Sequence, residues 1–112
     1  MKAINLNYLN KQAIAPKKGT IQLGDITHKY SEDEVIWITT GNSAVGKKKL
    51  CTAVIDKILV KTVSSLTSED ILLENPTINC TNKIPDYLTK MYHTLVTPHD
   101  TVSVITYYEL AE

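Results

Sequence analysis

The chain has 112 residues, of which twelve are lysine, none is arginine and twelve are acidic, so its formal net charge is zero. This length predicts one domain, residues 1–112, and the neutral total argues against a strong, sequence-blind attraction to a polyanion. No stretch is long and apolar enough for a signal peptide or a membrane span. We therefore expect a cytoplasmic protein with no membrane partner.

The charges are unevenly distributed along the chain. Residues 1–30 and residues 47–61 each hold five lysines and one acid, whereas residues 69–112 hold seven acids and two lysines. This pattern predicts a basic half that could meet an anionic ligand and an acidic C-terminal half that could meet a protein partner. Scattered, solvated surface charge would give the same counts, so both interpretations stay open at this point.

The first half of the chain predicts β-strands. In chain order we expect a strand at Lys2–Leu6, one or two helical turns at Tyr8–Ala15, and strands at Thr20–Leu23, Val35–Thr40 and Leu50–Val63. Pro16 stops the helical turns because proline cannot continue a helix, and Gly24 with Asp25 marks a turn. The last strand is so long that we expect it to bend or bulge near Asp56.

The second half predicts two helices and a closing strand. Thr67 precedes acidic residues in the way of a helix N-cap, and this helix ends near Asn75. A second helix begins at Pro85. Its apolar stripe consists of Leu88, Met91, Tyr92 and Leu95. With a strand at Thr101–Tyr108, the order predicts an α+β fold, a small and mostly antiparallel β-barrel with two or three short helices.

One segment nearly spells a phosphate-binding P-loop. Residues 41–48 read G-x-x-x-x-G-K-K, with Lys48 where the P-loop has the Ser or Thr that ligates magnesium. A P-loop must also open a helix whose N-terminus holds phosphate, but Lys49–Ile55 predicts a strand. We therefore interpret the segment as a hairpin loop with a positive edge made by Lys47, Lys48 and Lys49.

A second candidate ligand site lies early in the chain. Lys17, Lys18, Thr20 and Gln22 are close together in the sequence. Lysine can meet a phosphate as a point charge, and the other two side chains can hydrogen-bond a base edge or a sugar. Further candidates for the same ligand are Lys29, Tyr30 and Trp37. The two aromatic rings could stack on an unpaired base, although core packing would explain them equally well.

The sequence shows no pattern typical of an enzyme or a metalloprotein. No nucleophile stands at a recognisable spacing from a base. Neither Cys51 nor Cys80 belongs to a metal-binding pattern. We therefore predict no metal and no cofactor, and spacing alone assigns no catalytic residue.

Several segments together resemble the ASCH domain of the PUA-like superfamily, in its small archaeal form. They are KKGTIQLGD, KYSEDEVIWITTG, KKKLCTAVIDKILVKTVSSLTSEDILLENP and TVSVITYYEL. The resemblance implies a small β-barrel with a cleft beside the early motif G-x-K-x-x-[E/T]-x-R, and a role in RNA binding tied to translation or RNA modification. Lys17 and Thr20 match this motif, whereas Ala15 replaces its glycine and Gln22 its arginine.

The resemblance also implies an alternative activity. One bacterial branch of the family hydrolyses acetylcytidine with a lysine, a threonine and a glutamate, and Lys17 and Thr20 align with the first two. We expect the glutamate on the central strand, where this chain has Val54, with Asp56 two residues further on. The first expectation is thus a module that binds RNA or a nucleotide. The alternatives are a small amidohydrolase acting on a modified nucleoside and a protein-interaction module.

Overall fold

The computed structural model describes residues 1–6, 17–42, 46–75, 78 and 81–111. In chain order the strands and helices are β1 (Ala3–Leu6), β2 (Lys17–Leu23), β3 (Val35–Asn42), β4 (Gly46–Thr62), α1 (Ser68–Glu74), α2 (Ile84–Tyr92) and β5 (Thr101–Glu109). Single 3-10 turns at Val63–Ser65 and Thr81–Lys83 precede α1 and α2. The helical turns predicted at 8–15 lie outside the described residues.

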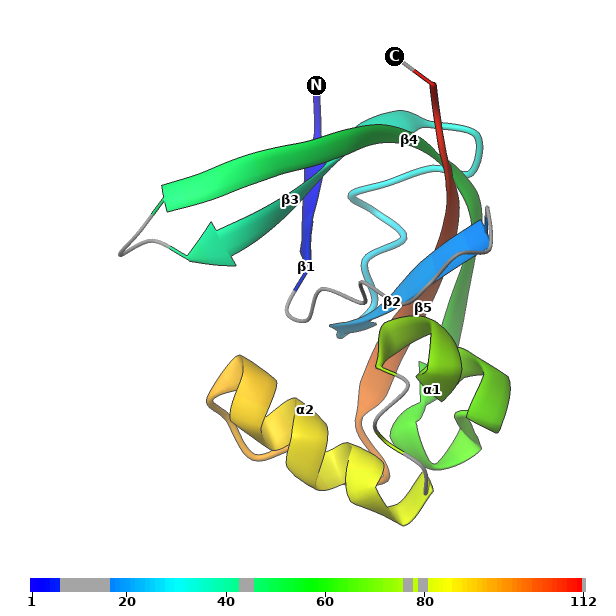
Figure 1. Ribbon diagram of the computed structural model, residues 1–112. Helices are drawn as coiled ribbons and strands as arrows, with labels where there is room; N and C mark the ends of the chain where they lie inside the picture. The colour runs from blue at the N-terminus through cyan, green and yellow to red at the C-terminus, as the bar shows by residue number, and fades with distance from the viewer. Residues whose placement is uncertain (7–16, 43–45, 76–77, 79–80, 112) are drawn as a thin grey trace.

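The strands form one curled sheet with the order β1-β3-β4-β5-β2. β1 pairs with β3 in parallel, and the other three pairs are antiparallel. The sheet closes about half of a barrel, and α1 and α2 lie together at one end of it (Figure 1). The predicted α+β class, with a mostly antiparallel, curled sheet and two helices, is therefore confirmed, and the sheet observed is a half-barrel. Among the described residues, no helix is long and apolar enough to cross a membrane.

Strand β4 gives the sheet its curl. It is 17 residues long and arches over the molecule, pairing first with β3 and then with β5 (Figure 1). The register with β5 shifts between Ile55 and Lys57, so Asp56 occupies the predicted bulge. A bulge increases the local twist and bends the strand, and this lets one strand turn from one end of the half-barrel to the other.

Strand β5 separates two hydrophobic cores. On one face, Ile105 and Tyr107 pack with β1 and β3 in a cluster that we call the barrel core. On the other face, Val102 and Val104 pack beneath α1 and α2 in the helix core. Alternate residues of a strand point to opposite faces, which explains why the run Val102–Tyr107 is buried at every position.

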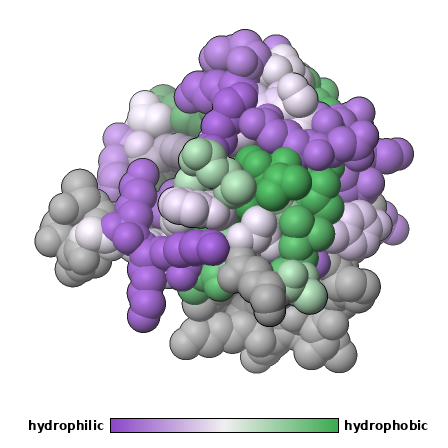
Figure 2. Space-filling model, turned by 90° about the horizontal axis from the view of Figure 1, so that it is seen from above, coloured by the Kyte–Doolittle hydropathy of each residue, from purple (hydrophilic) through white to green (hydrophobic). Residues whose placement is uncertain are grey.

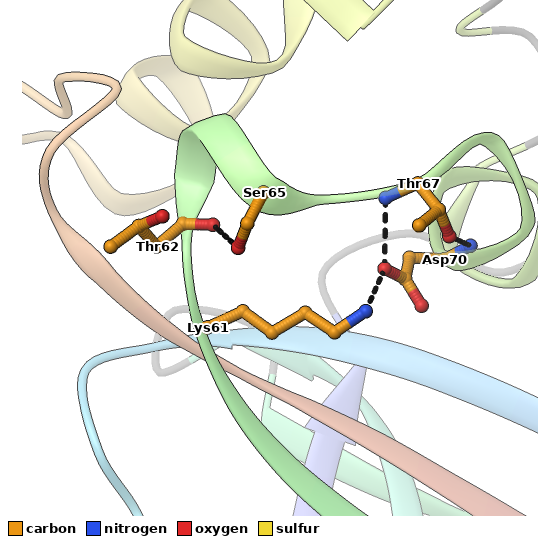
Figure 3. A network of polar contacts seen from close by, with 5 residues as sticks. All are labelled: Lys61, Thr62, Ser65, Thr67 and Asp70. Atoms are coloured by element: carbon orange, nitrogen blue, oxygen red, sulfur yellow. Dashed lines mark hydrogen bonds and ion pairs between the residues drawn. The ribbon is translucent and has the colours of Figure 1, made fainter.

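A partly buried ion pair connects helix α1 to β4. Thr67 is the N-cap, as predicted, and forms a capping box with Asp70: its hydroxyl accepts from the Asp70 amide, and its own amide donates to Asp70. The ammonium group of Lys61 donates to the same carboxylate over 2.8 Å (Figure 3). Nearby, the Ser65 hydroxyl donates to the Thr62 carbonyl and closes the turn between β4 and α1.

The prediction for the second helix was wrong at its C-terminal end. The helix ends at Tyr92 because His93 adopts a left-handed conformation with φ of 54°, which breaks the helical periodicity. Leu88 is fully buried as expected, but Leu95 lies beyond the helix with 78% of its surface exposed. Of the four residues of the predicted apolar stripe, Leu88 and Tyr92 therefore pack in the hydrophobic core beneath the helices.

Candidate functional site

The structure distributes the predicted binding residues over three places. Trp37, Lys47 and Lys49 line one groove. Thr20 and Gln22 lie on β2, at the opposite end of the sheet order from β1 and β3. Lys29 and Tyr30 lie between β2 and β3. The prediction treated these residues as one cleft, and the structure brings the first three together in one groove.

The first place is a groove of about 480 Å³ on the outer face of β1, β3 and β4, which we call the Trp37 groove. It is lined by Met1, Ala3, Asn5, Trp37, Thr39, Lys47 and Lys49. Ile36 and Ile38 point into the barrel core, so the intervening Trp37 points away from it and keeps 40% of its surface exposed. The volume lies within the usual range of small-ligand sites.

Two lysines reach the groove because of the β3–β4 hairpin. Its register pairs Thr39 with Lys49 and Gly41 with Lys47, which puts both lysines beside β3. The ammonium nitrogen of Lys49 lies 5.1 Å from the centroid of the Trp37 ring, a cation–π contact. Lys48, between them, is exposed but does not line the groove. Because the hairpin continues as β4, the interpretation of this segment as a lysine-edged hairpin and not a P-loop is confirmed.

Asn5 is a groove residue that sequence reasoning missed. Its amide nitrogen donates to the Gly41 carbonyl over 3.1 Å, and its oxygen accepts from the Thr39 hydroxyl over 2.9 Å. A signal was present in the sequence, because Asn5 is a polar residue between Ile4 and Leu6, both buried in the barrel core. Strict alternation would have placed it on the outer face together with Trp37.

The second place is a buried polar cluster at the edge of the sheet. Thr20 is 1% exposed, and its hydroxyl donates to Glu74 of α1 over 3.2 Å. The side-chain amide of Gln22 donates to the same hydroxyl over 3.1 Å. β2 is the terminal strand of the sheet order, so α1 and α2 can reach its outer edge, where the Tyr92 hydroxyl also donates to the Ile21 carbonyl.

The carboxyl group of Glu74 is poised to titrate near neutral pH. Burial raises its pKa to about 7, although hydrogen bonds from the Thr20 hydroxyl and the Ile21 amide act in the opposite direction. The Tyr87 hydroxyl is close enough to lower this pKa too, but its geometry is not that of a hydrogen bond. The Tyr87 hydroxyl and Glu74 Oε1 are both buried without a hydrogen-bond partner among the described residues. Such a group is a candidate general acid or base.

Sequence reasoning missed Glu74 because the ASCH resemblance places the catalytic glutamate on the central strand. Val54 and Asp56 lie on β4, which is separated from β2 by β5, and Asp56 accepts from the Thr106 hydroxyl instead. Glu74 comes from the last residue of α1. One signal existed in the sequence. A carboxylate at a helix C-terminus interacts unfavourably with the helix dipole, so its presence there indicates a structural or functional role.

Three other predicted residues have structural contacts. Lys18 forms an ion pair with Glu109 of β5 over 2.5 Å. The Tyr30 hydroxyl donates to the Ala3 carbonyl over 2.7 Å, and the backbone carbonyl of the exposed Lys29 accepts from Lys2. Lys17 begins β2, but its side chain lies outside the described residues.

Several acidic side chains of the C-terminal half form contacts within the protein. Asp70 is paired with Lys61, Glu74 is buried, and Glu109 is paired with Lys18. The side chain of Asp100 accepts hydrogen bonds from the amide and hydroxyl of Thr97. The charge separation along the sequence therefore holds the fold together in part.

The surface seen from above combines a hydrophobic area with strongly hydrophilic side chains around it (Figure 2).

Comparisons with known proteins found no relative. No family model, no curated protein and no solved structure matches the chain. The resemblance to the ASCH domain therefore stays a prediction, and the function has to be inferred from the geometry.

Proposed function

We propose that the chain binds unpaired RNA, or a nucleotide, in the Trp37 groove, on a half-barrel of the PUA-like type. The observation that carries this proposal is the exposed indole of Trp37 with Lys47 and Lys49 beside it. Single-stranded nucleic acid is bound by aromatic platforms on which bases stack, combined with cations that follow the backbone. The groove offers both, in a volume of about 480 Å³ that suits one nucleotide.

The neutral charge of the chain favours a local and selective site over a general polyanion surface. Two lysines line the groove. If each neutralises one phosphate of a single strand, the logarithm of the binding constant should fall with the logarithm of salt concentration with a slope of about −1.4. A steeper slope would mean that cations outside the groove also contact the strand.

Intrinsic fluorescence can test the proposal, because Trp37 is the only tryptophan of the chain. A short unpaired oligonucleotide should quench it saturably, since the base stacks on the indole itself. The double variant Lys47→Ala/Lys49→Ala should weaken binding at least tenfold. Lys57→Ala is the matched control: Lys57 is exposed and lies on β4 beyond the bulge, where it pairs with Thr106. It should leave binding unchanged.

Two results would contradict this assignment. Absence of saturable quenching by any unpaired oligonucleotide would reject RNA binding at Trp37. Loss of binding in Lys17→Ala/Lys18→Ala, with unchanged binding in the groove double variant, would move the site to β2.

A second candidate function is hydrolysis of a modified nucleoside such as acetylcytidine. The observation that favours it is the buried contact between Thr20 and Glu74. With Lys17 three residues before Thr20, the chain has a lysine, a threonine and a glutamate, as the amidohydrolase branch does, although Glu74 comes from α1 and not from the central strand where the ASCH resemblance implies the glutamate. A carboxyl group with a pKa of about 7 can both accept and donate a proton at neutral pH.

The reaction would add water across the amide bond. The C–N bond breaks, the acetyl carbon gains the hydroxyl of water to give acetate, and the exocyclic nitrogen gains the proton to give cytidine. In this proposal Glu74 takes the proton from the attacking water and delivers it to the exocyclic nitrogen. The amine of Lys17 assists the attack on the acetyl carbon, and Thr20 holds the carboxyl group of Glu74 in place.

Incubation with acetylcytidine followed by chromatography decides this second candidate. Cytidine should accumulate with the wild-type chain and not with Glu74→Gln, which keeps the size of the side chain but cannot take up a proton. Lys18→Ala is a suitable control, since its side chain pairs with Glu109 on β5. A wild-type chain that releases no cytidine above background rejects the enzyme.

A further inference from the structure

We propose that Asn5 is the residue that reads the base in the Trp37 groove, and that the base it selects is adenine. This inference rests on the proposed function, because it requires an unpaired nucleotide at Trp37. It adds a specificity determinant that neither the sequence pattern nor the resemblance assigns. Asn5 lines the same groove as Trp37 and comes from β1, the neighbour of β3 in the sheet.

The orientation of the Asn5 amide is fixed by its two partners. The Gly41 carbonyl can only accept, so the Asn5 atom beside it must be the nitrogen. The opposite atom is then the oxygen, which accepts from the Thr39 hydroxyl. A reversed amide would place two oxygens against each other at Gly41. The side chain therefore presents its donor and its acceptor in a set order, as reading a base edge requires.

The amide still has hydrogen-bonding capacity after these two contacts. An amide nitrogen carries two hydrogens and an amide oxygen two lone pairs. The contact with Gly41 uses one of the hydrogens, and the contact with Thr39 uses one of the lone pairs. Within the described part of the chain, one N–H and one lone pair therefore remain for a ligand, on a residue that is only half-buried.

Adenine is the base that suits this arrangement best. Asparagine pairs with adenine by donating to N7 and accepting from the N6 amino group. Every base offers a donor next to an acceptor on its Watson–Crick edge, so the selectivity for adenine rests on the Hoogsteen edge. Guanine offers two acceptors on its Hoogsteen edge. A purine also covers more of the Trp37 ring than a pyrimidine does, which strengthens stacking.

Thr39 acts as a positioning residue for Asn5. Its side chain is 8% exposed, and its hydroxyl lies 2.9 Å from the Asn5 oxygen and 3.5 Å from the Ile4 carbonyl. Thr39→Val keeps the shape of the side chain but removes the hydroxyl. The amide would then keep only the Gly41 contact, and its acceptor would lose its fixed direction.

The test uses four RNA pentamers, UUXUU, that differ only in the central base. We expect the wild-type chain to bind the pentamer with adenine about tenfold more tightly than the other three, measured by Trp37 quenching. In Asn5→Ala and in Thr39→Val this preference should fall to less than twofold, while affinity for UUUUU stays within twofold of wild type. Thr39→Ser, which restores the hydroxyl, should recover the preference.

The outcomes separate this inference from the proposed function. Equal binding of all four pentamers by the wild-type chain, or a preference that survives in both Asn5→Ala and Thr39→Val, overturns the role of Asn5 and leaves RNA binding intact. No binding of any pentamer overturns the proposed function together with the inference. Thr39→Val keeps the experiment decisive if Asn5→Ala does not fold, since the two variants perturb different strands.

Discussion

At the scale of single residues, Glu74 has an unusual environment: its carboxyl group is buried in the edge of the sheet. A carboxyl group that is 3% exposed normally has a charged partner, but Glu74 accepts hydrogen bonds from two neutral groups, the Thr20 hydroxyl and the Ile21 amide. Burial disfavours the charged form, so the folded protein holds the proton on Glu74 up to a pH of about 7. The unfolded chain releases the same proton near the ordinary pKa of 4.5.

We expect stability to fall as the pH rises through this interval. Between pH 4.5 and 7 the folded state binds more protons than the unfolded state, so unfolding becomes easier with increasing pH. The loss should reach roughly 3 kcal/mol and level off above pH 7. Glu74→Gln, which cannot ionise, should lack this fall. Urea unfolding of both proteins from pH 5 to pH 8 measures the difference.

Comparing the two proteins at each pH cancels the titration of every other group. Parallel stability curves for wild type and Glu74→Gln would show that the carboxyl group finds enough solvent or partners in the folded state to ionise normally.

Single residues also show what a sequence can and cannot predict. Trp37, Lys47 and Lys49 were predicted as binding residues, and alternation on β3 and β4 brings them into one groove. Asn5 and Glu74 were not predicted, because each meets its partners across a tertiary contact. Glu74 contacts Thr20 although 54 positions separate them, and no local pattern encodes such a distance.

At the scale of elements, α1 depends on β4 for its anchoring. The helix has only seven residues, too few to be stable alone. Burial acts to raise the pKa of Asp70, but the hydrogen bond from Lys61 and the contacts with Thr67 outweigh it, so the pKa lies below its ordinary value. The ion pair thus fixes the helix N-terminus onto the sheet (Figure 3).

We expect Lys61→Met to lower the free energy of unfolding by about 1 to 3 kcal/mol at pH 7, because it leaves the Asp70 carboxylate without its cation in a mostly buried position. A depressed pKa adds stability above the unfolded pKa of Asp70, and this contribution is lost as the pH falls through the folded pKa. The gap between wild type and variant should therefore shrink at pH 3. Denaturant unfolding at both pH values checks this, and a gap independent of pH would contradict it.

The elements also differ in how well the sequence predicted them. The α1 N-cap at Thr67 and the bulge at Asp56 are local features, and both are confirmed. The predicted end of α2 was wrong because the left-handed residue that ends the helix is His93 and not a glycine, the residue that usually indicates such an end. β2 begins at Lys17, earlier than the β-propensity of its residues indicates, because pairing with β5 extends it.

At the scale of the whole molecule, β5 joins the two cores into one unit. Ile105 belongs to the barrel core and Val104 to the helix core, and both are almost fully buried. A destabilising substitution in one core should therefore also lower the stability of the other. The sequence predicted the strand but not its position between β4 and β2, because strand order follows from long-range pairing.

We expect the two cores to unfold together. Ile38→Ala in the barrel core and Leu88→Ala in the helix core should each cost about 2 to 5 kcal/mol. Both should shift one common transition when it is monitored by Trp37 fluorescence on the barrel side and by far-UV circular dichroism of the helices. Two separate midpoints in either variant would show instead that β5 does not couple the cores.

The pairing of β5 with β2 also bears on how the chain is made. β2 occupies residues 17–23, yet its strand partner is the last described strand of the chain, Thr101–Glu109. At ribosomal speeds, roughly 4 to 16 s pass between the synthesis of one and of the other. During that time the nascent chain holds an unpaired strand whose neighbour does not yet exist. The protein can therefore complete its fold only after β5 has left the ribosome. Until then, β2 is the strand on which chaperones that bind exposed strand edges could act for the longest time.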